Sequence, residues 1–200
     1  DRFLLRSYSP VGVIGGGTVL DPLPPAGRPH WPEGLDALEP SARLRAVVER
    51  RPRGVAVGLL PILLGATEDE LAPLLGDPLL ARKDGMLVPV TAVERAAAHA
   101  AALVTAHHVR KPAEAGISLE TVRQALEVFG VAGSVALERL LADGRLVPEG
   151  AMLRAPEFRS IVRGGDAQLE RILGAVEDAG LTPPTVAELE ASLGVRGVAD

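Results

Sequence analysis

A single order of predicted elements occurs twice along this 200-residue chain and begins a third time. Three short helices precede two strands joined by a tight turn, and the order returns after roughly 60 to 70 residues, a period that indicates a repeated structural unit. The helices are recognised by apolar residues at helical spacing, and the strands by short apolar runs beside turn residues. The repeats predict complete units at 41–90 and 91–157, and the truncated start of a third at 166–200.

The first unit is predicted from its capping residues and its turn. We expect Ser41 and Thr67 to cap helices, because their side-chain oxygens can accept from free backbone N–H groups. The Asp-Gly pair in Arg82-Lys83-Asp84-Gly85 is a strong hairpin signal. The predicted elements are a helix after Ser41, a helix over Val55–Leu64 bent near Pro61, a helix from Thr67 to Leu75, and strands Leu79–Ala81 and Met86–Val90.

The second unit repeats this order, and the third contains its first part. An Ala-rich stretch predicts a long first helix, and Glu149-Gly150 predicts the turn of the hairpin. The expected elements are helices Thr91–His108, Leu119–Val128 (capped by Ser118) and Val135–Ala142 (capped by Ser134), and strands Leu146–Pro148 and Met152–Arg154. In the third unit we expect a helix from Asp166 and a helix over Val186–Leu193, capped by Thr185.

Residues 1–22 differ from everything that follows, because they predict two strands, Phe3–Tyr8 and Val11–Leu20, joined at Ser9-Pro10. Two strands do not form a stable sheet alone, so we expect the chain to begin inside a larger domain. Residues 22–40 contain six prolines and two glycines. Proline fixes φ and removes a backbone donor, so 23–40 is predicted to be an extended linker.

A helix-turn-helix followed by a two-stranded wing is the winged-helix module. The predicted fold class is therefore mainly α with small β-hairpins, arranged as tandem winged-helix repeats after a hairpin. Aromatic residues make up 2% of the chain, so its cores must be built from Leu, Val, Ile and Ala.

Composition excludes several classes of function. The chain has no Cys, which rules out disulfides, thiolate metal sites and Cys nucleophiles and fits a reducing cytoplasm. It has no apolar run of roughly 18 residues, the length that a membrane span needs. Its net charge is −5, and the net charge of residues 166–200 alone is also −5. A general phosphate-binding protein would be basic, so any contact with nucleic acid must be local.

No catalytic, cofactor-binding or metal-binding residue is predicted. Gly15-Gly16-Gly17 lacks the following helix and Lys of a phosphate loop, so it indicates a strand where backbones approach closely. His107 and His108 point about 100° apart on a helix, and His99 lies eight residues before His107. The histidines therefore favour a solvated or packed helix end over a metal site. No Ser-His-Asp or paired-carboxylate pattern is recognisable, although separated residues can converge in space.

The candidate nucleic-acid contacts are cations in or near the wings, where winged helices commonly bind. Solvated surface charge is the alternative explanation for each of them. The third helix of the first unit begins with three acids, and that of the second unit has nearly balanced charges. The candidates are Arg82 and Lys83 in one wing, Arg145 and Arg154 in the other, and the pair Arg110-Lys111.

Three blocks of this sequence resemble the selenocysteine-specific translation elongation factors, the SelB family. In residues 1–22, an Arg-Phe-x-(apolar)-Arg strand, a turn and a glycine-containing strand resemble the end of the third, β-barrel domain, and Ile14–Pro22 reads IGGGTVLDP, a typical form in that family. His107–Leu126, HHVRKPAEAGISLETVRQAL, is similar to the second winged helix. Leu169–Leu193, LERILGAVEDAGLTPPTVAELEASL, is similar to the opening of the third.

The resemblance implies a fragment of a larger factor, covering the end of the β-barrel domain and the first two to three winged-helix domains. The full factor would be a cytoplasmic GTPase that uses GTP and magnesium and delivers selenocysteinyl-tRNA to a ribosome paused at a UGA codon. Its last winged helices would grip a selenocysteine-insertion hairpin in the messenger RNA. The GTPase domain lies outside this chain, so we expect no enzyme activity here.

In that setting residues 41–165 would be a monomeric spacer between the tRNA-binding body and the messenger-binding end. The turn Ser7–Pro10, with Ser7 and Ser9, is a candidate contact with tRNA, and we expect the chain alone to bind nucleic acid weakly. The alternative is a tandem winged-helix DNA-binding regulator or a chromosome-associated scaffold, which leaves residues 1–22 unexplained.

Overall fold

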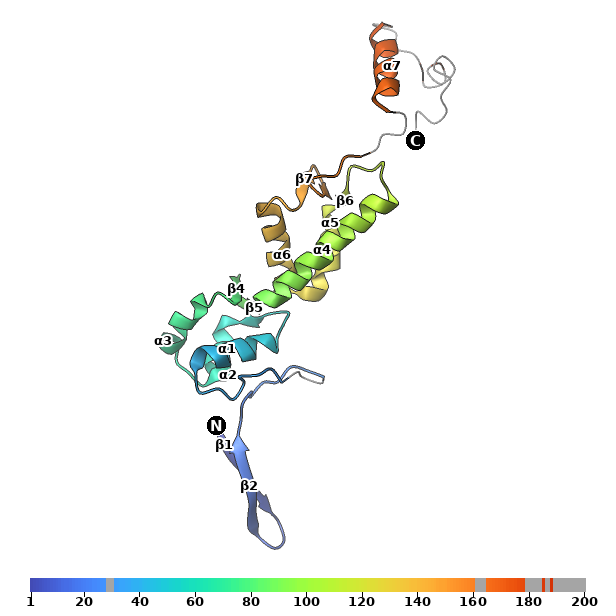
Figure 1. Cartoon of the computed structure of the whole chain (residues 1–200). Coiled ribbons are helices and arrows are strands. Elements are labelled where there is room, and N and C mark those ends of the chain that lie inside the picture. The colour runs from blue at the N-terminus through green and yellow to red at the C-terminus, as the bar shows by residue number, and fades with distance from the viewer. Residues whose placement is uncertain (28–30, 161–164, 179–184, 186–187, 189–200) are drawn as a thin grey trace.

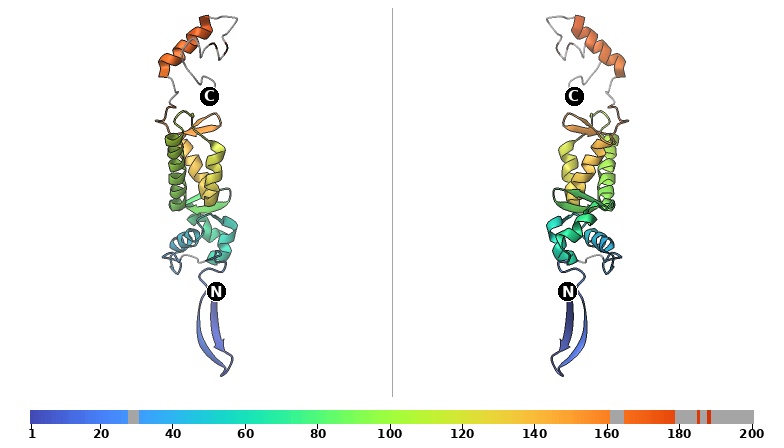
Figure 2. Two further views of the ribbon diagram at one scale, coloured as in Figure 1. Left: turned by 90° about the vertical axis from the view of Figure 1, so that its right-hand side faces the viewer. Right: turned by 90° about the vertical axis from the view of Figure 1, so that its left-hand side faces the viewer.

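The computed structural model describes residues 1–27, 31–160, 165–178, 185 and 188. It combines helices with small antiparallel sheets of two or three strands. A β-hairpin, a first unit and a second unit follow one another along an elongated arrangement (Figures 1 and 2). No helix within these residues has the length and apolar character that crossing a membrane requires.

The hairpin consists of β1 (Arg2–Ser7) and β2 (Gly12–Thr18), paired antiparallel with an irregularity between Leu5 and Arg6. β1 is shifted by one residue from its predicted bounds and β2 is shorter than predicted, but the pairing is confirmed. Two glycines of β2 accommodate the opposite strand: a Cβ at Gly17 would lie 2.9 Å from the Phe3 ring, and one at Gly16 would lie 2.6 Å from the Phe3 carbonyl oxygen. Gly16 and Gly17 therefore serve close packing within a hairpin, as predicted, whereas the Cβ position of Gly15 has open space around it. β2 leads into no helix.

The apolar side chains of this hairpin are largely uncovered. Leu4, Leu5, Val13 and Ile14 are each more than half exposed, and Phe3 is 44% exposed. A two-stranded sheet gains its stability from packing against other elements, and the described residues place none against this one. The hairpin thus has apolar surface on its strands with no cover in this structure.

The first unit covers residues 40–89, and its three strands form one sheet in the order β3-β5-β4. The short strand after the first helix joins the edge of the predicted hairpin, pairing Val55 with Leu87. The elements are α1 (Pro40–Glu49), β3 (Val55–Ala56), a 3-10 turn (Val57–Leu59), α2 (Leu60–Leu64), α3 (Glu68–Leu71), a 3-10 turn (Ala72–Gly76), β4 (Leu80–Lys83) and β5 (Met86–Pro89).

Two predictions in the first unit are wrong. Ser41 does not cap α1; the cap is Glu39, whose carboxylate accepts from the backbone N–H groups of Ser41 and Ala42, because Pro40 takes the first helical position. The helix predicted over Val55–Leu64 begins as a strand, because Val55 and Ala56 complete the sheet. Thr67 is confirmed as a cap, since it forms a reciprocal capping box with Glu70.

The second unit covers residues 90–154 and has the same order of elements, with its sheet in the order β6-β8-β7. Its first helix, α4, continues from β5 without a linker (Figure 1). The elements are α4 (Val90–Arg110), β6 (Ile117–Ser118), α5 (Leu119–Leu126), a 3-10 turn (Glu127–Phe129), α6 (Val131–Ala142), β7 (Val147–Glu149) and β8 (Met152–Arg154).

The capping predictions of the second unit fail at both serines. Ser118 stands at the cap position of α5, but its side chain makes no capping hydrogen bond. Ser134 lies inside α6, which begins at Val131 because Gly130 turns the chain with φ 57°. The hairpin β7–β8 is confirmed with small shifts of its bounds.

In the third unit the predicted first helix is observed as α7 (Gly165–Asp178). Thr185 and Glu188 bond as in a capping box, the Thr185 N–H donating to the Glu188 carboxylate over 2.8 Å and the Glu188 N–H to Thr185 Oγ1 over 3.4 Å. Except for Glu188, the helix predicted over Val186–Leu193 lies outside the described residues.

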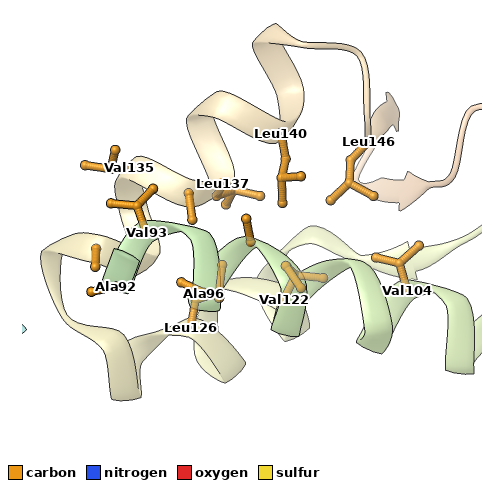
Figure 3. Close-up of a cluster of buried hydrophobic side chains, with 14 of the residues drawn as sticks. Ala92, Val93, Ala96, Val104, Val122, Leu126, Val135, Leu137, Leu140 and Leu146 are labelled. Atoms are coloured by element: carbon orange, nitrogen blue, oxygen red, sulfur yellow. The ribbon is translucent and has the colours of Figure 1, made fainter. Parts of the chain in front are cut away.

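The two units share the sheet of the first unit between their cores. Adjacent residues of a strand face opposite sides of a sheet, and here both sides of β5 are covered. Leu87 belongs to the core of the first unit, while Val88, with Ala81 from β4, belongs to the core of the second; Leu87 and Val88 are fully buried. Figure 3 shows part of the second core, in which Val93 and Val104 of α4 face α6 and Leu146. The units therefore pack as one body.

A second contact between the units lies at the start of α6. The Val131 N–H donates to the Arg53 carbonyl over 3.2 Å. A Cβ at Gly130 would lie 2.6 Å from that same carbonyl oxygen. Lys83 of β4 forms an ion pair with Glu138 of α6. This joint requires both the positive φ and the missing side chain of Gly130.

We therefore expect Gly130→Ala to lower the free energy of unfolding by about 2–4 kcal/mol, since it adds left-handed strain and a clash with Arg53. Gly144→Ala is the matched control, because Gly144 also has positive φ (66°) but open space around its Cβ position. It should cost about 1 kcal/mol. Urea unfolding measures both, and equal losses would contradict a role of Gly130 in the joint.

Candidate nucleic-acid interface

The hairpin β4–β5, the predicted wing of the first unit, offers one exposed cation and one that is paired. Arg82 is exposed on the edge strand β4. Lys83 lies in the same strand and not in the turn, which consists of Asp84-Gly85, and its ammonium is paired with Glu138. Only Arg82 of this predicted pair is therefore available to a phosphate without breaking an ion pair.

The predicted cations of the second wing are also constrained. Arg154 Nε lies 2.8 Å from Glu149, and Arg154 Nη1 donates to the carbonyls of Ala155, Pro156 and Phe158 over 3.2–3.4 Å. The Arg154 guanidinium is therefore engaged by neighbouring groups of its own chain and is not free to bind a ligand. Arg145 is exposed, but the hollow that it lines with Arg139 also contains Glu94 and Asp143.

The pair at the end of α4 is partly neutralised. The Lys111 ammonium lies 2.8 Å from the Glu114 carboxylate, and His107 Nε2 lies 3.0 Å from the same carboxyl group. These contacts, the hydrogen bond from Lys111 first, lower the pKa of Glu114. Arg110 is exposed, with its Nε donating to the Ala106 carbonyl over 3.3 Å.

In the hairpin turn, Ser7 donates to the carbonyl of Pro10 and Ser9 is exposed. The predicted residues do not converge on one surface. Ser7 and Ser9 lie in the hairpin, Arg82 and Lys83 where the units meet, and Arg110, Lys111 and Arg154 near the far end of the second unit (Figure 1). Paired or scattered cations make a poor phosphate-binding surface.

If the second unit is a winged helix, the helix that would read bases is α6. Here α6 faces a groove that is also lined by Arg53 and Lys83 of the first unit. The groove also contains Arg123 and three acids, Glu120, Glu127 and Glu138. Its three cations and three acids offset one another, so the groove presents no net positive charge to the phosphates of a duplex.

Sequence reasoning missed an anchor built on Asp21, whose side chain is 2% exposed. Arg51 Nη2 donates to both Asp21 oxygens over 2.8 and 2.9 Å and to the Leu23 carbonyl over 2.7 Å. Arg50 Nη1 lies 3.3 Å from Asp21, and the Arg50 guanidinium lies 4.7 Å from the centre of the Trp31 ring. The Asp-Pro at the end of the IGGGTVLDP block therefore attaches the chain after the hairpin to the end of α1.

A signal for this anchor was present in the sequence. Adjacent arginines at a helix end suggest a favourable dipole interaction, but two neighbouring cations also repel, and a buried carboxylate between them relieves that repulsion. The partner lies 30 positions away, which no local pattern reveals.

Two of the histidines predicted to end a helix or pack on it lie against aromatic rings. His99 packs on Phe129 with ring centroids 5.5 Å apart, and the His108 ring is buried and stacked on Phe158. Burial, with the nearby His107 and Arg154, lowers the pKa of His108. Within the described residues, no cluster of three or more His, Cys, Asp or Glu side chains is suited to hold a metal ion.

Comparison with known proteins identifies no family for this chain. No family model matches it, and no curated protein matches it significantly.

We expect Asp21→Ala to destabilise the first unit by about 3–5 kcal/mol, because it leaves two arginines at the end of α1 without their buried partner. Asp36→Ala removes an exposed carboxylate from the same linker and should change stability by less than about 0.5 kcal/mol. Fluorescence of Trp31, the single tryptophan, follows unfolding of this region in urea. An Asp21→Ala protein as stable as the control would contradict the anchor.

Proposed function

We propose that this chain is part of a SelB-like selenocysteine-specific translation elongation factor. In this proposal residues 1–22 belong to a β-barrel domain. Residues 41–157 are two winged-helix units that hold the tRNA-binding body at a fixed distance from the messenger-binding end. The observation that carries the proposal is the IGGGTVLDP block in an apolar, uncovered hairpin that is anchored to a rigid pair of repeated units.

The order of elements supports the winged-helix part of the proposal. Both units run helix, short strand, two helices and a hairpin, and in both the short strand pairs with the last strand of the hairpin. This is the arrangement expected of a winged helix, in which a helix-turn-helix is followed by a wing.

The joint between the units supports a spacer. A spacer must transmit a distance, which requires contacts that hold its parts as one body. β5 contributes to both cores, α4 follows it directly, and the Arg53 carbonyl bonds to the start of α6. The hairpin side is attached through Asp21.

The alternative function, a tandem winged-helix DNA-binding regulator or chromosome scaffold, is favoured by the same order of elements. It would use α6 and the wings, but the groove beside α6 contains as many acids as cations and Arg154 is bonded to its own chain. The alternative also assigns no role to the hairpin.

The proposal predicts that the full gene containing this chain restores selenium incorporation at UGA codons in a host that lacks its own selenocysteine elongation factor. The host would also receive the selenocysteine tRNA and a selenoprotein messenger from the same source as the gene. Asp21→Ala should reduce incorporation because it loosens the anchor between hairpin and spacer, whereas Asp36→Ala should not. Radioactive selenium in the reporter protein is the measurement, and no incorporation with soluble, full-length protein would contradict the proposal.

Binding assays with the chain itself separate the two functions. The spacer should bind neither duplex DNA nor a selenocysteine-insertion hairpin tightly, since its predicted cations are scattered or paired. A gel shift with duplex DNA whose affinity falls steeply with added salt would favour the DNA-binding regulator.

A further inference from the structure

The chain that leaves the second unit is held against it by an uncommon set of contacts. We call residues Ala155–Phe158 the strap; it follows β8 directly. The Phe158 ring stacks on His108 of α4 with centroids 3.6 Å apart and an interplanar angle of 10°. The Ala155 N–H donates to His108 Nε2 over 3.1 Å. Arg154 adds the three hydrogen bonds to strap carbonyls described above.

The hydrogen bond from Ala155 assigns the protonation state of His108. A ring nitrogen that accepts a hydrogen bond carries no proton, so His108 is neutral with its proton on Nδ1 while the strap is closed. Protonation of Nε2 would replace this acceptor with a second donor facing the Ala155 N–H. The buried ring would then carry a charge with no acceptor at this position.

The groups around His108 oppose that charge. Arg154 of β8 is a fixed cation, and His107 directly precedes His108 on α4. Both disfavour protonation of His108. Two acids at this end of the unit are engaged by other groups, because Glu114 contacts His107 and Lys111, and Glu149 pairs with Arg154. Glu157 of the strap is exposed. Burial acts in the same direction, and His108 is 8% exposed.

We propose that His108, Arg154 and Phe158 form a latch that fixes the direction in which the chain leaves the second unit, and that protonation of His108 opens it. The latch is a local device and does not depend on the proposed function. It holds the strap closed above the pH at which a free histidine titrates and releases it as the pH falls. Its effect is on the orientation of everything that follows the strap.

The absence of cysteine makes a direct test possible. Ala102→Cys on α4 and Glu157→Cys in the strap, both exposed positions, would carry a pair of spin labels in the full chain. Pulsed electron paramagnetic resonance then gives the distribution of distances between the labels. At about pH 8, where an unperturbed histidine is neutral, one narrow distribution is expected. Phe158→Ala should lower the ratio of closed to open strap roughly tenfold, the factor that about 1.4 kcal/mol represents.

Acidification separates the titration of His108 from simple packing. At about pH 5, below the ordinary histidine range, the distribution of the unsubstituted latch should broaden. In His108→Gln, whose side chain stays neutral, it should not change between the two pH values. His99→Gln is the matched control and should broaden on acidification like the unsubstituted latch. Labels at Ala102 and Asp143, both within the second unit, report whether any variant has unfolded.

Two results would overturn the latch. One is a distribution that is already broad at the higher pH or that Phe158→Ala leaves unchanged. The other is an acid response that persists in His108→Gln, since the switch would then lie in another group.

Discussion

The burial of β5 on both faces is the constraint on which the rest of the structure depends. A short three-stranded sheet normally covers one face with its own helices and leaves the other to solvent. Here Leu87 enters one core and Val88 the other, while Ala81 of β4 joins the second. Because α4 starts where β5 ends, the second unit packs directly on the second face of the sheet of the first unit. A small sheet thus contributes to the cores of both units and holds them together.

That arrangement also determines the charge beside α6. Packing the second unit on the sheet brings α6 beside Arg53 and Lys83, which line a groove that also contains Arg123 and three acids. The cations and acids offset one another, so the contacts between the units leave no net positive charge beside the helix that could have read nucleic acid. Gly130 permits the close approach of the two backbones at this point.

Local signals in the sequence predicted most of the elements, whereas the contacts that organise them are long-range. The repeated order, the hairpin of each of the two units and the Thr67 cap follow from turn chemistry and apolar spacing. Ser41 and Ser134 were mistaken for caps because Pro40 and Gly130 decide where their helices begin.

The short strands β3 and β6 carry only two residues each and are stabilised by pairing with distant strands. Asp21 with Arg51, and Lys83 with Glu138, join residues 30 and 55 positions apart, which spacing does not reveal.

The use of charge follows from the same packing. Arg154 binds the carbonyls of the strap, Arg50 and Arg51 enclose Asp21, and Lys83 holds α6. Each of these cations stabilises a junction between segments and is therefore not free to bind a ligand. The net charge of the chain is in addition negative, at −5. Under the proposed function this is what a spacer requires. A segment between two RNA-binding parts would compete with them for phosphate if its own cations were free, so placing cations inside junctions makes the spacer rigid and at the same time weakens its attraction for RNA.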